Sequence, residues 1–265
     1  MFSNDSDRPV TPDADPKRVP SALSIGLARS ASDLEAAQRL RYAVFAEELG
    51  ANLGSARGAI DRDEFDIYCD HLLVRVRETG QVIGTYRILP PHRRAQVGRF
   101  YSDSEFDLSR LLHLRPSLIE VGRSCVHANH RTGAAILMLW AGLARYMRRG
   151  QYRHLIGCAS APLVDGGTQA AGLRDKLQAY LAGPEYRAFP HMPFPHEGIA
   201  RPANVEIPPL IKGYLRLGAK VCGEPAWDPD FNSADFLIWL SLDELHPRYA
   251  RHFDLLAMQG EAATV

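Results

Sequence analysis

The strongest constraint on the fold is one long helix that the sequence predicts between two strands. Residues 132–149 have helical spacing and end at Gly150. This segment is apolar on nearly every side, through Ile136, Leu137, Met138, Leu139, Trp140, Leu143 and Met147. Such a helix is typically buried against a sheet. Strand patterns at residues 117–127 and 152–159 flank it, so the unit predicts a parallel strand pair joined by a right-handed crossover.

The elements on either side of this unit predict a mixed α/β (α+β) architecture. Apolar residues alternate with arginines in residues 72–77, and a turn at residues 78–81 leads into a second strand at residues 82–89, which indicates a hairpin. Further strands are expected at residues 23–27 and 236–242, and further helices at residues 32–50, 105–112, 168–181 and 209–217.

A proline-rich insertion is expected at about residues 184–209. Its seven prolines exclude regular helix and predict an extended course over the surface. Tyr186, Phe189 and Phe194 are candidate anchors to the core. Two interpretations stay open at this point: a cover over a ligand channel, or a connector packed on the core.

The composition restricts the partners and the compartment. The 265 residues contain 31 basic and 31 acidic side chains, so a general attraction to nucleic acid is not expected. Four scattered cysteines without CxxC spacing favour reduced thiols in the cytosol. Since no run of ~20 apolar residues is present to span a bilayer, a cytoplasmic protein is expected, either soluble or bound peripherally to a membrane.

The first residues differ in composition from the rest. Residues 1–20 carry four prolines among polar residues, which predicts a disordered tail. Residues 21–265 are long enough to bury a substantial core, and we expect them to form a single domain.

A single arginine interrupts the apolar face of the first predicted helix. Ser32 and Glu35 have the spacing of a capping box. A charged series starts inside the apolar stripe at Arg41 and continues in the order Asp61, Asp63, Asp66, Arg87, Glu120 and Arg123. A guanidinium group that faces a core needs carboxylate partners, because an unpaired buried charge costs several kcal/mol. The alternative is that Arg41 reaches solvent along its aliphatic stem and that the others are ordinary surface charges.

Two members of this series share the strand at residues 117–127. Glu120 and Arg123 are an odd number of residues apart, so a regular strand would direct them to opposite faces. Gly122 lies between them and is typical of a bulge, which would bring both charges to one face and separate this strand from its neighbour. Backbone N–H groups freed in this way can hold an oxyanion. A surface ion pair with a glycine chosen for packing is the alternative.

The long helix begins with small residues at Arg131, Thr132 and Gly133, where N–H groups and the helix dipole can hold a phosphate. No Walker or GxGxxG motif is present.

The sequence indicates no metal site. The acidic run at residues 61–66 fails as an EF-hand loop, because Phe65 occupies a ligand position and the required glycine is missing. An ammonium group or a neighbouring arginine is a better candidate for these carboxylates. Cys125 has no convincing base and is interpreted as a small buried residue.

The charged series resembles the signature of acyl-homoserine lactone synthases. The matching residues are Arg41 and Phe45, then Asp61, Asp63 and Asp66, then Arg87, and finally Glu120 with Arg123, in order over about the first half of the chain. The sequence departs from that signature at Asp61, where the family has Glu, and at Ala51, where it has Trp. The resemblance implies the GNAT acyltransferase fold, with a mixed central sheet, a splayed strand pair, helices on both faces and here a C-terminal elaboration.

Over its whole length the chain is more similar to a sister family, the bacterial L-ornithine Nα-acyltransferases of ornithine-lipid synthesis. The residues that carry this likeness are the segment EVGRSCVH at residues 120–127, the helix start RTGA and the segment at residues 208–231. The resemblance implies transfer of a 3-hydroxyacyl group from acyl carrier protein to the α-amine of L-ornithine, without a metal or another cofactor.

The same resemblance implies roles for individual residues. Glu120 is the expected base, with Arg123 beside it. Arg41, Phe45, Asp61, Asp63, Asp66 and Arg87 are expected to order the loop over the amine and to bind substrate. Arg131, Thr132 and Gly133 would hold the pantetheine phosphate. A basic cluster would dock the acidic carrier protein, and it consists of Arg145, Arg148, Arg149 and Arg153.

Two alternatives to this function remain. One is an enzyme that accepts a different amine, with S-adenosylmethionine as the obvious case. The other is a non-enzymatic protein that acts on membranes or binds acyl carrier protein. A product that is a lipid also leaves peripheral contact with the inner membrane open.

Overall fold

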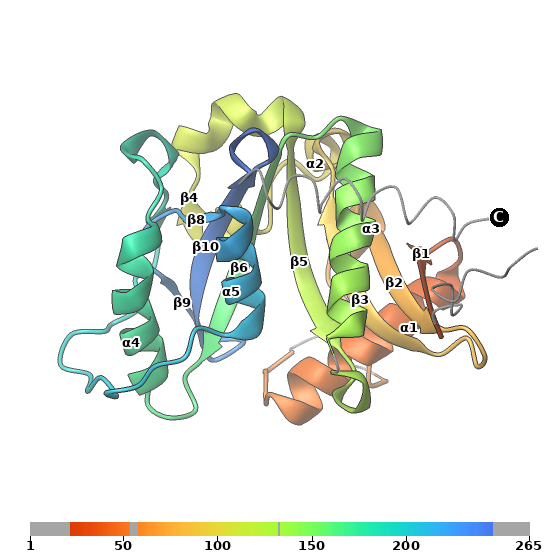
Figure 1. Cartoon of the computed structure of the whole chain (residues 1–265), viewed down its shortest axis with the longest axis horizontal. Coiled ribbons are helices and arrows are strands. Elements are labelled where there is room, and N and C mark those ends of the chain that lie inside the picture. The colour runs from red at the N-terminus through yellow and green to blue at the C-terminus, as the bar shows by residue number, and fades with distance from the viewer. Residues whose placement is uncertain (1–21, 54–57, 132, 246–265) are drawn as a thin grey trace, which may run out of the picture.

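The computed structural model describes residues 22–53, 58–131 and 133–245, and an eight-stranded sheet forms its centre (Figure 1). The strands run in the order β1, β2, β3, β5, β6, β10 and β8, and β9 pairs with β10. Their bounds are Leu23–Leu27, Asp70–Val76, Val82–Leu89, Leu118–Val126, His154–Pro162, Ser233–Ser241 and Lys220–Val221 in that order, with β9 at Ala226–Asp228. The β5–β6 pair is parallel and the other pairs of this sheet are antiparallel.

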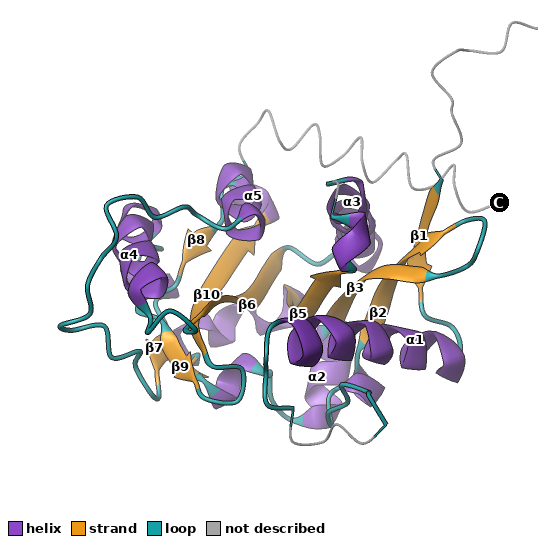
Figure 2. Ribbon diagram, turned by 90° about the horizontal axis from the view of Figure 1, so that it is seen from below, coloured by secondary structure: helices purple, strands orange, loops and turns teal. Residues whose placement is uncertain are grey.

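Helices cover both faces of this sheet (Figure 2). One face carries α3 (Ala134–Gly150), α4 (Thr168–Leu177) and α5 (Pro209–Leu217), and the other carries α1 (Ala31–Tyr42) and α2 (Pro91–Val97). The helix α1 continues as a π-helical segment, Ala43–Glu48. The predicted mixed sheet with helices on both faces is confirmed, and β8, β9, β10 and α5 form the C-terminal elaboration.

The α3 helix packs on the sheet as its apolar pattern predicts. Leu139, Leu143 and Met147 are buried in the main core, whereas Leu137 is about half exposed. Gly142 permits close approach, since a Cβ atom there would lie 2.5 Å from the Ile25 side chain. The parallel pair that flanks this helix was therefore predictable from the sequence.

The strands β5 and β6 separate after three paired residues. Their register runs from Leu118–His154 to Glu120–Ile156 and ends there, and the two ribbons diverge beyond that point (Figure 1). Gly157 lies at the point of separation, where a Cβ atom would be 2.4 Å from the backbone oxygen of Val121. The predicted splayed pair is thus present, and only glycine fits at its junction.

The predicted bulge in β5 is also present, one residue beyond Gly122. Gly122 pairs with Arg87 and Cys125 with Thr85, so Arg123 and the next residue oppose a single residue of β3. Arg123 itself has φ of 52°, in the left-handed region that L residues other than glycine seldom adopt. This extra residue reverses the alternation of the strand and brings the Arg123 side chain to the face that carries Glu120.

Three local expectations were wrong. Residues 105–112 form no α-helix: they contain β4 (Phe106–Asp107), which pairs with β7 (Phe189–Pro190), and a 3-10 segment, Ser109–Ser117, follows. The Asp107 carboxylate accepts the Ser109 N–H and starts that segment. The cap of α1 lies two residues earlier than expected, because Ser30 Oγ accepts the Asp33 N–H at 3.1 Å.

The third concerns the proline-rich segment, in which Phe189 does not act as an anchor, since it is about half exposed. Phe194 is buried, and Tyr186 stacks on Trp239 with ring centroids 4.1 Å apart. None of residues 184–209 lines the cavity of about 260 Å³ that opens between β5 and β6. This segment is therefore a connector packed on the core and not a cover over that cavity.

Within the described ranges, no helix has the length and apolar character needed to cross a membrane. The predicted tail at residues 1–20 lies outside the described residues.

Candidate active site

A cavity of about 260 Å³ opens where β5 and β6 separate. Its wall comes from β3, β5, β6, β10 and α5, together with the segments that contain Phe45, Tyr101 and Phe231. Side chains from both faces of the sheet line it. Tyr86, Val121 and Ile238 belong to the core under α3 and α5, while Glu120 and Asp235 come from strand positions of the opposite parity. The cavity therefore passes through the sheet.

The two ends of this cavity differ in polarity. On the side of α3 and α5 its lining is largely apolar and includes Val121, Leu155, Leu210 and Ile238, together with the hydroxyl groups of Tyr86 and Tyr214. On the other side the lining is charged and polar, and includes Arg87, Glu120, Arg123, Asp228 and Asp235. Such a channel suits a molecule with a long apolar part that reacts at a polar end.

Glu120 lies in the polar half and is held by three hydrogen bonds. Its Oε2 accepts the Tyr101 N–H at 2.6 Å, and its Oε1 accepts both the N–H and the hydroxyl group of Ser102, at 2.8 and 2.6 Å. These three donors leave one acceptor position on Oε2. Burial raises the pKa of Glu120 above that of an ordinary glutamate, and the three bonds offset this only in part.

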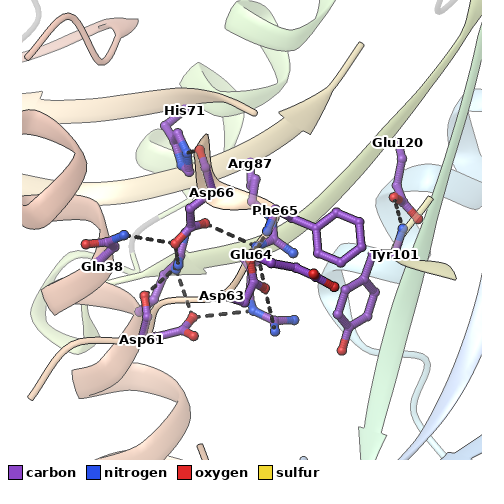
Figure 3. A network of polar contacts seen from close by, with 12 residues as sticks. Gln38, Asp61, Asp63, Glu64, Phe65, Asp66, His71, Arg87, Tyr101 and Glu120 are labelled. Carbon is purple, nitrogen blue, oxygen red and sulfur yellow. Dashed lines mark hydrogen bonds and ion pairs between the residues drawn. The ribbon is translucent and has the colours of Figure 1, made fainter. Parts of the chain in front are cut away.

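An ion-pair network includes Asp61, Asp63, Asp66 and Arg87 (Figure 3). Arg41 is fully buried and belongs to the same network. Its Nε donates to Asp61 Oδ2 at 2.8 Å and its terminal nitrogens donate to both oxygens of Asp66, at 3.0 and 2.8 Å. It also donates to the backbone oxygen of Asp61 at 2.6 Å. The alternative of a solvated Arg41 is therefore excluded.

Arg87 and Arg123 complete this network. Arg87 Nη1 donates to Asp63 at 2.6 Å and to Asp66 Oδ1 at 3.1 Å, and Arg123 lies 3.4 Å from Asp61 and 3.3 Å from Asp63. Burial raises the pKa of Asp66, but the hydrogen bonds and charges of Arg41 and Arg87 outweigh it and hold that pKa well below the usual range. Three arginines thus balance three aspartates.

The structure separates the predicted substrate-binding residues into two groups. Phe45 and Arg87 line the cavity, as do Glu120 and Arg123. Arg41, Asp61, Asp63 and Asp66 do not line it and are occupied by one another or by Arg87 and Arg123. This arrangement matches the expected role in ordering the loop, whereas direct contact with substrate stays a prediction.

A pair of tyrosines at the apolar end of the cavity was not predicted from the sequence. The hydroxyl groups of Tyr86 on β3 and Tyr214 on α5 are hydrogen-bonded to each other, and both rings line the cavity. Burial raises the pKa of both phenols, so both are neutral and one can donate a proton into the cavity.

A group of carboxylates beside the polar half of the cavity was also not predicted from the sequence. Asp228 on β9, Asp235 on β10 and Glu105 before β4 converge near Cys158 of β6. Ligand atoms of Glu105, Cys158 and Asp235 lie within 4.8 Å of one another, so the geometry would permit a metal ion here although the sequence indicated none.

The residues predicted to hold phosphate lie before α3. Gly133 has φ of 88° and precedes the first helical residue, Ala134, so the helix begins later than expected. The guanidinium group of Arg131 is paired with both oxygens of Glu48, at 2.5 and 2.7 Å. Thr132 lies outside the described residues.

The predicted basic cluster lies toward the other end of α3. Arg145, Arg148 and Arg149 are roughly 18 to 24 Å from Gly133 along a helix that rises 1.5 Å per residue. Arg153 is paired with Asp243 at 2.6 Å, and its N–H binds the oxygen of Ser117, next to the start of β5. The cluster is therefore remote from the end at which β5 and β6 separate.

The chain is similar in sequence to known acyltransferases. The family profile described as "Acetyltransferase (GNAT) domain" matches residues 40–141. An L-ornithine N(alpha)-acyltransferase from Rhodobacter capsulatus is 38% identical over 91% of this chain and 98% of its own length. Another from Brucella abortus is 36% identical over 88% of this chain and 89% of its own.

The fold has a solved counterpart. FeeM, an N-acyl amino acid synthase from uncultured soil microbes, superposes with a TM-score of 0.52 and 12% identity, over 87% of this chain and 99% of that one. This likeness supports the fold alone. Together with the two sequence relatives, it shows that the chain is an acyltransferase of the GNAT fold and belongs to the L-ornithine Nα-acyltransferase family.

Proposed function

We propose that the protein transfers a 3-hydroxyacyl group from acyl carrier protein to the α-amino group of L-ornithine and so forms lyso-ornithine lipid. The observation that carries this proposal is the cavity through the sheet, with an apolar end and a polar end that meet beside Glu120. The names of relatives that are 36% to 38% identical over most of the chain support ornithine as the acceptor.

Acyl transfer to an amine requires a base near the nitrogen atom. An α-amine in the polar half can approach the free acceptor position of Glu120 Oε2, directly or through one water molecule. The carboxylate takes one proton as the nitrogen attacks the thioester carbon. Because burial raises the pKa of Glu120, it is a stronger base than an exposed glutamate.

The remaining steps need a place for negative charge and a proton for the leaving group. Beyond Glu120, β5 has no register partner on β6, and its residues 121–124 line the cavity, so backbone N–H groups of this stretch are the candidates to hold the thioester oxygen as it gains negative charge. When the carbon–sulfur bond breaks, the departing thiolate takes up a proton. The proton that Glu120 took from the nitrogen can pass to this thiolate, directly or through water, which returns Glu120 to its ionised form.

We include Arg131 and Gly133 in the proposal as contacts for the phosphate of the pantetheine arm, since they precede α3. Carrier docking at Arg145, Arg148, Arg149 and Arg153 has less support, because this cluster is remote from the opening between β5 and β6. Its acidic partner Asp243 also compensates part of its charge.

The test is a reaction of the purified full chain with 3-hydroxyacyl carrier protein and single amines, followed by mass spectrometry. We expect one product with L-ornithine, and fragmentation should assign the acyl group to the α-nitrogen. Nα-acetylornithine is the matched control and should give no product. Acyl-coenzyme A in place of the carrier protein tests the donor.

Product with S-adenosylmethionine and none with ornithine would contradict the proposed acceptor. Binding of the carrier protein without thiol release on addition of any amine would contradict the proposed enzymatic role.

A further inference from the structure

We infer that the acidic wall formed by Glu105, Asp228 and Asp235 is the recognition site for the side-chain ammonium group of the amine substrate. This inference rests on the proposed function, since ornithine carries a second amine at the end of its side chain. The specificity for a basic amino acid would then come from residues outside the charged series that runs from Arg41 to Arg123.

The acidic wall lies in the same cavity as Glu120 but comes from other elements. Asp235 and Asp228 line the cavity from β10 and β9, and both are more than nine-tenths buried. Glu105, in the segment before β4, is not among the residues that line the cavity. It contacts the wall through Cys158 of β6, which lines the cavity and donates to Glu105 Oε2 at 3.3 Å. Two parts of the chain that are remote in sequence, the β9–β10 pair and the segment before β4, thus direct carboxylates to one place.

Unused hydrogen-bonding capacity in this wall points to a ligand. Asp228 Oδ1 accepts the N–H groups of Asp230 and Phe231, while Oδ2 has no hydrogen-bond partner among the described residues. Glu105 Oε1 is a buried atom that also has no partner. An unsatisfied buried oxygen such as Glu105 Oε1 is costly. An ammonium group has three donors to offer to it and to Asp228 Oδ2.

The balance of charge distinguishes this wall from the arginine–aspartate network. Asp61, Asp63 and Asp66 are matched by Arg41, Arg87 and Arg123 and have no charge to spare. In the acidic wall, the hydrogen-bond donors are neutral: Ser233 donates to Asp235 at 2.6 Å, and Cys158 and backbone N–H groups serve the other two. The guanidinium group of Arg123 also acts on Asp235, but it is already paired with Asp61 and Asp63. A cation is therefore what the wall lacks.

Burial and like charges oppose ionisation throughout the acidic wall. Burial raises the pKa of Asp235 to about 6; Asp228 of β9 adds to the increase, while Ser233, Ser160 of β6 and Arg123 of β5 oppose it. Glu105 and Cys158 face the same group, and burial with the charges of Asp235 and Asp228 raises the pKa of Glu105 to about 9. A cation bound in the acidic wall would relieve this mutual repulsion.

The test compares L-ornithine with L-norvaline, which has the same carbon chain without the terminal amine. For the wild-type enzyme we expect a clear preference for ornithine in kcat/KM. Asp228→Asn and Asp235→Asn should each lower kcat/KM for ornithine about tenfold to a hundredfold, mainly through KM, as loss of a charged hydrogen bond implies. The value for norvaline should change less than threefold. Asp228→Asn retains an oxygen for the Asp230 and Phe231 N–H groups, so it is the safer variant for folding.

Asp230→Asn is the matched control, because Asp230 is exposed, lies two residues from Asp228 and does not line this cavity. It should leave both values unchanged. Unchanged ornithine-to-norvaline preference in both test variants would overturn the inference while leaving the proposed function intact.

Calorimetric binding of each amino acid without donor separates the two claims. If the wild type binds ornithine but does not acylate it, and Asp235→Asn abolishes the binding, the recognition site is supported and the proposed function is refuted. Absence of both binding and acylation would contradict both. Loss of activity in EDTA that Zn²⁺ restores, in the wild type but not in Asp235→Asn, would instead make the wall a metal site and overturn the inference.

Discussion

Replacement of Arg41 by alanine should cost about 3 to 5 kcal/mol in the free energy of unfolding, the range for removal of one partner from a buried ion pair. Arg41 donates four hydrogen bonds, to the carboxylates of Asp61 and Asp66 and to the backbone of Asp61. Without it, two aspartates that are at most 3% exposed would share only Arg87 and Arg123. For a chain of this size the loss corresponds to a fall in Tm of roughly 6 to 20 °C.

The assay is urea unfolding followed by circular dichroism at pH 7, with Arg39→Ala as the matched control on the same helix. Arg39 forms an exposed ion pair with Glu35, so its loss should cost no more than about 0.5 kcal/mol. In an Asp66→Asn background Arg41→Ala should cost less than in the wild type, because one unpaired charge is already gone. A difference below about 1 kcal/mol between Arg41→Ala and Arg39→Ala would refute the reasoning.

The depressed pKa of Asp66 fixes the sign of the pH dependence. A carboxylate whose pKa is lower in the folded state contributes stability above the unfolded value of about 3.9, and this contribution is lost as the pH falls toward the folded value. The gap between the wild type and Arg41→Ala should therefore narrow below about pH 4. A gap that widens with acid would contradict the assignment.

The remaining predictions concern the splayed strands, the base and carrier docking. Gly157→Ala should destabilise the protein by about 1 to 3 kcal/mol and remove activity, because its Cβ would meet the Val121 oxygen. Gly26→Ala, with open space around it, is the control and should not reduce activity. Thermal unfolding measures the stability of each variant, and a thiol-release assay measures its activity. Glu120→Gln should lower kcat about 10² to 10⁴-fold, with a modest fall in Tm because the Tyr101 N–H loses its acceptor. The wild-type rate should rise with pH around an apparent pKa above the ordinary glutamate value. Wild-type rates in the Glu120→Gln variant across this pH range would exclude Glu120 as the base. Arg149→Glu and Arg153→Glu should change KM for acyl carrier protein less than twofold, and a tenfold increase would restore the basic cluster as the docking site.

The parts of the fold that were predictable from the sequence have strong local patterns. The apolar α3 between two strands required a parallel pair, and Gly122 between two charges indicated the bulge that Arg123 adopts. The segment at residues 105–112 has helical spacing but forms no α-helix, because Phe106 pairs with Pro190 instead.

The site was predictable only where its residues share one charged series. Arg41 belonged to an apolar stripe, so its need for partners could be inferred. Contacts of Glu120 with the backbone of Tyr101 and Ser102 have no signature in side-chain patterns. Asp228 and Asp235 lie together because β9 and β10 pair in the sheet. The two polar residues Ser233 and Asp235 at the start of a largely apolar strand were an available signal.

A structure of the full chain with L-ornithine and a non-hydrolysable acyl-pantetheine tests the central claim most directly. The account predicts that the pantetheine arm passes between β5 and β6 beside Gly157, with the α-amine on the side of Glu120 Oε2 and the thioester between the two halves of the cavity. A thioester bound elsewhere, or an α-amine on the apolar side next to Tyr214, would contradict it.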